Sequence, residues 1–306
     1  MLVLDAGDLL FKKNIIPVPE NNSRSVTAKA EVIIESFNRM GYDAMGIGDD
    51  DLTFGKEFLL EISKKANFPL LSSNVFDESS GKPLWRPYLL KEVAGLRIGI
   101  FSLLGPETFL GETDSRRKGL TLRSPVEVAQ NMVKELQPKT DLIILLSHLS
   151  YPRDLELAQA VSGIHIIVGA HTAMNLVNPP VVKNTIVLQT APKGMYIGRL
   201  DLIFSNHGAP FYNLAIKRSL ENNIKNYDAR LNSKEVPENG KTEARKMKED
   251  AERKLQQLQG MNEFQNKILA LTEALKEDPE IASLVQTYTS KFPGPGPGPG
   301  ASPSPQ

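Results

Sequence analysis

The amino-acid sequence predicts an α/β fold in which helices cover a sheet. Over residues 1–205, short apolar runs rich in β-branched residues alternate with segments of helical periodicity, a pattern typical of α/β proteins. The expected helices cover about residues 29–40, 56–65, 125–136 and 154–161, the third with Ser124 as its N-cap. The expected strands are Leu2–Asp5, Ala44–Gly48, Leu70–Ser73, Leu96–Leu103, Leu142–Ser147, Ile164–Gly169, Thr185–Gln189 and Gly198–Phe204.

The charge balance and the lack of cysteine exclude several classes of function. The chain has 306 residues, 24% of them charged, and a formal net charge of zero, so it offers no basic excess for nucleic acid or an anionic membrane. No apolar stretch is long enough to span a bilayer. Without cysteine the chain has no disulfide, thiolate metal site or cysteine nucleophile. We therefore expect neither nucleic acid nor a membrane as a partner.

The composition changes after residue 205. We expect a domain over 1–205, a helical extension over 206–291 and a Pro/Gly-rich disordered tail over 292–306. Within 242–275, apolar residues recur every three or four positions, interrupted by Gly260, which predicts a long amphipathic helix. This helix would dock on the main domain or pair with a second copy as a coiled coil, so self-association through 242–275 is expected.

Acidic and imidazole side chains follow four of the expected strands. Asp8 and Asp49 come after the first two, while His148 and His171 close two later ones. In open α/β sheets, ligands bind beyond the carboxyl ends of the strands, and carboxylates with imidazoles are typical metal ligands. These four residues predict a metal site. Taken singly, each could instead be a turn residue or a core side chain.

Asp49, Asp50 and Asp51 form an acidic run. Two such charges about 4 Å apart repel by roughly 4 kcal/mol at an effective dielectric constant of about 20. A cation would relieve that repulsion, or one pKa would rise; the alternative is a solvated loop that caps the next helix. His165 is expected to be structural and His207 to lie in a surface turn. The sequence contains no serine nucleophile elbow, Walker loop or dinucleotide fingerprint.

Six segments, in this order, resemble motifs of one family: LVLDAGD, GYDAMGIGDDDLTFG, FPLLSSNV, IGIFSLLGPET, DLIILLSHLSYPRDLELAQAVSGIHIIVGAHT and TIVLQTAPKGMYIGRLDLIF. They are similar to the calcineurin-like metallophosphoesterases, specifically the 5'-nucleotidase and UDP-sugar hydrolase branch. The resemblance covers about residues 1–205. It implies a four-layer αββα sandwich of two mixed sheets, here with a C-terminal helical extension, and a two-metal site that activates water.

The resemblance also implies roles for individual residues. Asp8 would bridge two metals, Asp49 would stand in the place of a metal-binding Asn, and His148 and His171 would complete one site for Mn, Zn, Co or Mg. Asp50 replaces the motif His that donates to the phosphoryl group, and a carboxylate there would repel a phosphate. Ala173 replaces a ligand of the other metal, whose Asp-x-His motif would lie upstream of Met1. One metal site is therefore expected, and the second lacks ligands.

Two functions follow from this resemblance. The first is a metal-dependent phosphoester hydrolase of 5'-nucleotidase type, weakened in turnover, with a small phosphoester, possibly a nucleotide, as substrate. The second is a degenerate phosphoesterase domain used for binding or assembly. The chain opens inside its first strand, so an incomplete N-terminus is expected. If a signal segment is missing there, the branch implies a periplasmic or secreted location; the chain itself leaves location open.

Overall fold

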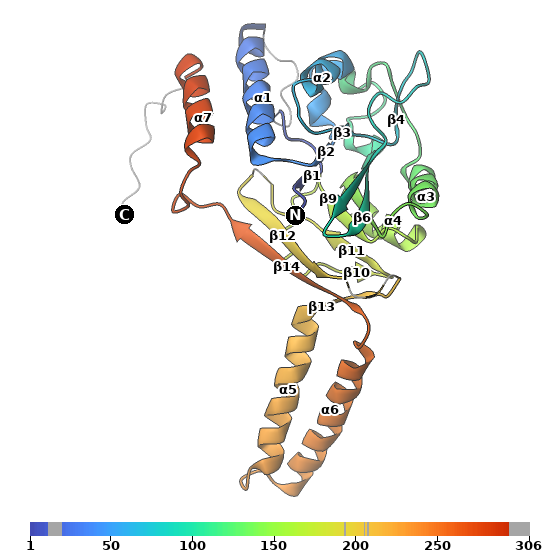
Figure 1. Ribbon diagram of the computed structural model, residues 1–306, viewed down its shortest axis with the longest axis vertical. Helices are drawn as coiled ribbons and strands as arrows, with labels where there is room; N and C mark the ends of the chain where they lie inside the picture. Colours follow the sequence, from blue (N-terminus) through green and yellow to red (C-terminus); the bar gives the residue numbers. More distant parts are fainter. Residues whose placement is uncertain (12–19, 193, 205, 207, 294–306) are drawn as a thin grey trace. The chain divides into compact units, whose positions relative to one another are not determined.

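The computed structural model describes residues 1–11, 20–192, 194–204, 206 and 208–293, which form two compact units (Figure 1). The first unit combines Met1–Thr172 with the segment from Thr272 onward, and the second is Ala173–Leu271. Most of the expected Pro/Gly-rich tail lies outside the described residues. The three-part organisation with a boundary at residue 205 stays a prediction.

Parallel strands form the centre of the first unit. Its longest strands, β6 (Leu96–Leu104) and β8 (Leu142–His148), pair in parallel with Ile100 beside Ile144, and all seven residues of β8 are buried. Such continuous burial explains why the β8 sequence reads as one apolar run. One parallel sheet consists of β1 (Leu4–Asp5), β2 (Ala44–Gly46) and β3 (Leu70–Leu71). A second group of paired strands has the order β9 (Ile166–Gly169), β8, β6 and β5 (Tyr88–Val93), of which β5 is antiparallel to its neighbour. A separate antiparallel pair is formed by β4 (Val75–Asp77) and β7 (Leu120–Leu122).

Three of the four expected helices begin and end within a few residues of their predicted positions, whereas the first begins at Glu20, well before residue 29. The Ser124 side chain accepts a hydrogen bond from the Glu127 backbone N–H, which confirms the predicted cap. α1 (Glu20–Met40) buries Ala30, Ile34 and Phe37 at helical spacing, while Met40 at its end is exposed. The helices are α1 (Glu20–Met40), α2 (Gly55–Ser63), α3 (Pro125–Leu136), α4 (Tyr151–Ala160) and α7 (Pro279–Lys291), with 3-10 turns η1 (Asp50–Leu52), η2 (Pro106–Thr108) and η3 (Ser115–Arg117).

The second unit contains a helical hairpin and a mixed sheet of three strands (Figure 1). The helices α5 (Leu214–Asn232) and α6 (Glu238–Gln257) pack against each other, with Ala244 and Ala251 of α6 buried. Its elements are β10 (Val181–Val182) paired with β11 (Thr185–Leu188), the sheet β12 (Tyr196–Ile203), β14 (Asn262–Ala270) and β13 (Phe211–Asn213) in that order, and α5 (Leu214–Asn232) and α6 (Glu238–Gln257).

The long helix predicted over 242–275 is wrong beyond α6. The helix ends at Gln257, Gly260 adopts a positive φ of 77°, and the following residues form β14. The apolar residues of that stretch, Phe264 and Ile268, are four apart. A spacing of four puts residues on one face of a helix and equally on one face of a strand. The predicted coiled coil is therefore not supported, and self-association stays a prediction.

The mixed α/β class predicted from the sequence is confirmed. All eight predicted strands are present, with shifts of a few residues at their ends. Among the described residues, no helix has the length and apolar character needed to cross a membrane.

Candidate metal centre

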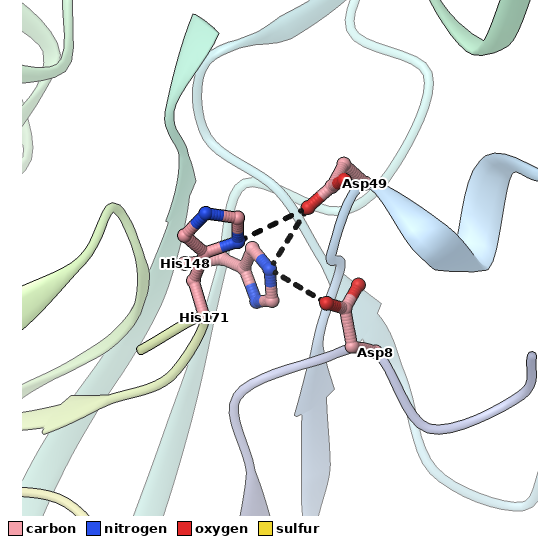
Figure 2. Close-up of side chains that lie close together, drawn as sticks. All are labelled: Asp8, Asp49, His148 and His171. Atoms are coloured by element: carbon pink, nitrogen blue, oxygen red, sulfur yellow. Dashed lines mark hydrogen bonds and ion pairs between the residues drawn. The ribbon is translucent and has the colours of Figure 1, made fainter. Parts of the chain in front are cut away.

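Four side chains from four separate segments of the first unit meet at one point (Figure 2). Asp8 follows β1, Asp49 follows β2, His148 ends β8 and His171 follows β9. Each offers one ligand atom, and these atoms all lie within 4.8 Å of one another. The structure therefore brings together the four predicted metal-site residues as a cluster able to hold a metal ion.

His148 lies at the centre of this cluster and is fully buried. Its Nε2 lies 3.1 Å from Asp8 Oδ2 and 3.2 Å from Asp49 Oδ1. Its Nδ1 lies 3.0 Å from the carbonyl oxygen of Ala6, so a proton on Nδ1 leaves Nε2 directed at the carboxylates. His171 Nδ1 lies 3.4 Å from the same Asp49 oxygen. Asp8 and His171 are 24% and 18% exposed in their side chains, so the cluster opens to solvent on their side.

The backbone around the cluster adopts uncommon conformations. Asp8 and His171 both have positive φ, 63° and 66°, which a side-chain-bearing residue adopts only when its surroundings stabilise it. A Cβ at Gly48 would lie 2.2 Å from Asp8 Oδ1 and 2.7 Å from His148 Cε1. Only glycine fits at position 48, because two of the four side chains occupy the space of its missing Cβ.

Asp51 is a structural residue rather than a ligand. Its two carboxylate oxygens accept hydrogen bonds from the backbone N–H groups of Asp8, Leu9, Leu10 and Gly48 at 2.9–3.0 Å. These bonds tie the turn after β1 to the turn after β2, which sets Asp8 beside Asp49. The run Asp49–Asp51 is buried, so the alternative of a solvated loop is wrong.

Arg116 compensates the other two acids of the run. Its Nη1 lies 2.6 Å from Asp49 Oδ2 and 2.6 Å from Asp50 Oδ1, and Asp114 binds the opposite edge of the guanidinium. The charge of Asp50, expected to repel a phosphate, is thus paired with a cation. Sequence reasoning missed Arg116, because 67 residues separate it from Asp49.

The acidic run is relieved in both ways that the sequence analysis considered. Burial, together with the charge of Asp8, raises the pKa of Asp51 to about 7. Burial also acts to raise the pKa of Asp49, but hydrogen bonds from His148 and His171 and the charge of Arg116 outweigh it and hold that pKa below its usual value. Burial acts to lower the pKa of His148, but the charge of Asp8 together with hydrogen bonds to Asp49, Asp8 and the Ala6 carbonyl outweighs it and raises that pKa well above its usual value.

Two further titratable residues near β8, the buried Asp154 and the half-buried His165, form other contacts and lie outside the cluster. Asp154 receives a 2.5 Å hydrogen bond from Ser147 Oγ, and burial raises its pKa to about 7. His165 Nδ1 accepts from the Ile143 backbone N–H at 3.0 Å, which agrees with the predicted structural role. His207 lies outside the described residues.

The sequence of this chain is similar to that of known 5'-nucleotidases. None of the family models matches the chain. The 5'-nucleotidase of Vibrio cholerae is 29% identical over 237 residues, which cover 67% of this chain and 41% of that protein.

Two solved structures share the fold of the chain. They are the 5'-nucleotidase precursor of Thermus thermophilus, 24% identical with a TM-score of 0.63 over 95% of this chain and 49% of that chain, and the calcineurin-like phosphoesterase YfkN of Bacillus subtilis, 16% identical with a TM-score of 0.61 over 95% of this chain and 83% of that chain. The chain belongs to the calcineurin-like metallophosphoesterases, where it corresponds to the N-terminal region of the 5'-nucleotidase branch. It spans less than half the length of the curated relative.

Proposed function

We propose that the chain is a metal-dependent phosphoester hydrolase domain of 5'-nucleotidase type with reduced turnover. The observation that carries the proposal is the convergence of Asp8, Asp49, His148 and His171, whose ligand atoms lie within 4.8 Å of one another. Similarity to a 5'-nucleotidase supports a small phosphoester, possibly a nucleotide, as substrate. We also propose the four-layer sandwich with a C-terminal helical extension as the finer description of the fold.

The donor set fits a divalent cation. Two carboxylates and two imidazoles suit Zn, Mn or Co, and the carboxylates also suit Mg. Bound there, such an ion would polarise a phosphoryl oxygen and lower the pKa of a water molecule. The chain orients this donor set through the Ala6 carbonyl, which holds His148, and through Asp51, which holds the turn of Asp8.

Reduced turnover is proposed from position 50. Asp50 accepts a hydrogen bond from Arg116 and offers no donor to a phosphoryl oxygen, where the family motif has a His. Loss of one preorganised donor typically lowers kcat by about 100- to 1000-fold. Ala173 provides no ligand atom, so we propose one occupied metal site. The alternative, a degenerate domain used for binding, is favoured by the same two positions.

The test is metal content together with hydrolysis of p-nitrophenyl phosphate in the presence of Mn, Zn, Co or Mg. We expect slow hydrolysis that His148→Ala and His171→Ala both abolish along with metal binding. His165→Gln is the matched control, since His165 is a half-buried imidazole outside the cluster, and it should retain both properties. One tightly bound ion without any hydrolysis would reject the enzyme and favour the degenerate domain.

A further inference from the structure

One guanidinium lies among the carboxylates of the cluster, and the proposed reaction assigns it no role. Arg116 belongs to η3 and is only 5% exposed. Its Nη1 lies 2.6 Å from oxygens of both Asp49 and Asp50. Charge-assisted hydrogen bonds of this length are among the strongest that proteins form.

Arg116 is held in this position from behind. Asp114 accepts hydrogen bonds from the Arg116 backbone N–H at 3.0 Å and from Nη2 at 2.7 Å. The ring of Phe109 lies 5.5 Å from the guanidinium carbon and adds a cation–π contact. Because three carboxylates surround the planar guanidinium, it is oriented before any ligand arrives and is not directed at a substrate.

The two oxygens of Asp49 consequently have different partners. Oδ1 lies 3.2 Å from His148 Nε2 and 3.4 Å from His171 Nδ1. Oδ2 is bound by Arg116, as is the neighbouring Asp50. Asp49 therefore presents one oxygen to the cluster, while its second oxygen and Asp50, which could have formed a further cation site, face a permanent positive charge.

We infer that Arg116 is the resident counter-charge of this centre and limits it to one divalent cation. The guanidinium takes the place that a second ion would have beside Asp49 and Asp50. Arg116 is thus a positioning residue that acts through these two carboxylates. The inference rests on the proposed metal site, but it concerns the number and affinity of bound ions and not hydrolysis.

The test measures Mn²⁺ binding to the full chain by equilibrium dialysis and calorimetry. The wild type should bind one ion. Arg116→Gln uncovers two carboxylates, so we expect a second bound ion and at least about tenfold tighter binding of the first. Arg116→Lys keeps the charge and should bind one ion. Arg117→Gln is the matched control, since Arg117 contacts the same Phe109 ring but forms no ion pair among the described residues.

A double-mutant cycle keeps the inference testable if Arg116→Gln alone does not fold. Asp50→Asn leaves Arg116 with surplus positive charge, so Mn²⁺ should bind about tenfold more weakly than to the wild type. Adding Arg116→Gln removes that surplus and should recover the lost affinity.

Three results would overturn the inference: two ions on the wild-type chain, unchanged stoichiometry and affinity in Arg116→Gln, or no recovery in the double variant. A wild-type chain that binds no ion overturns both this inference and the proposed function. One bound ion without hydrolysis rejects the hydrolase alone.

Discussion

The metal cluster and the α5–α6 hairpin use charged residues in opposite ways. At the cluster, Asp49, Asp50 and His148 are at most 3% exposed, and each is bound by a residue from a distant segment. In the hairpin, Lys248 pairs with Asp228 and Lys254 with Asp250, and these four side chains are 27–57% exposed. Exposed pairs add little to stability, whereas buried charges are costly unless their partners are in place. The difference indicates that the charges of the cluster depend on partners that the fold holds in place, while those of the hairpin can also rely on water.

The largest contrast should come from adding one methyl group to each region. Gly48→Ala places a Cβ against Asp8 and His148, so the four ligand atoms cannot converge. We expect Mn²⁺ affinity to fall by at least about 100-fold and the melting temperature to drop. Gly240→Ala, within α6, should shift the free energy of unfolding by less than about 1 kcal/mol. Calorimetric Mn²⁺ titration and thermal melts measure both effects; retained affinity in Gly48→Ala would contradict the geometry.

A smaller contrast is expected from acid-to-amide changes. Each carboxylate oxygen of Asp51 accepts hydrogen bonds from two backbone N–H groups. Asp51→Asn replaces one of these oxygens by an NH2 group, which can only donate, so two backbone N–H groups lose their acceptor. We expect the free energy of unfolding in urea at pH 8 to fall by about 2–4 kcal/mol. Asp228→Asn in the hairpin should leave unfolding almost unchanged. Equal effects of the two substitutions would mean that Asp51 does not hold the turn of Asp8.

The pH dependence of stability should differ in sign between the two regions. The pKa of Asp154 is raised from its usual value to about 7 by burial, so its stabilising neutral form is fully present below about pH 4 and is lost as pH rises toward 7. The free energy of unfolding of Asp154→Asn should therefore exceed that of the wild type by about 1–3 kcal/mol at pH 8 and match it near pH 4.

The hairpin provides the control for this prediction. Hydrogen bonding to Lys254 lowers the pKa of Asp250, so its contribution is lost as pH falls. Asp250→Asn should consequently not be more stable than the wild type at pH 8, in contrast to Asp154→Asn. Urea titrations at both pH values make the comparison, and a pH-independent difference for Asp154→Asn would show that its carboxyl does not titrate with folding.

The smallest effect should come from the exposed side of the hairpin. Met247 is 46% exposed on α6, although it belongs to the stripe that predicted a long helix. Met247→Ala should change the free energy of unfolding by less than about 0.5 kcal/mol. A larger loss of stability, together with concentration-dependent sedimentation that the substitution abolishes, would instead support the predicted self-association of this segment.

The sequence predicts the residues of the cluster better than the residues around them. Strand ends are visible locally, since a buried run that stops at Asp8 or His148 has few alternatives. Arg116 lies in a short 3-10 turn whose N-cap is Asp114, and nothing nearby in sequence shows that Arg116 meets Asp49. β14 was missed for another reason, because Phe264 and Ile268 have a spacing that fits both helix and strand.

The four segments that form the cluster are far apart along the chain, at residues 8, 49, 148 and 171. In the unfolded chain these side chains are dispersed, so a cation held by the cluster would bind the folded form selectively. By mass action, an ion at 100 times its dissociation constant would add about 2.7 kcal/mol to folding. This gain would also offset the backbone strain at Asp8 and His171. Metal supply would thus control the persistence of the folded first unit as well as its chemistry.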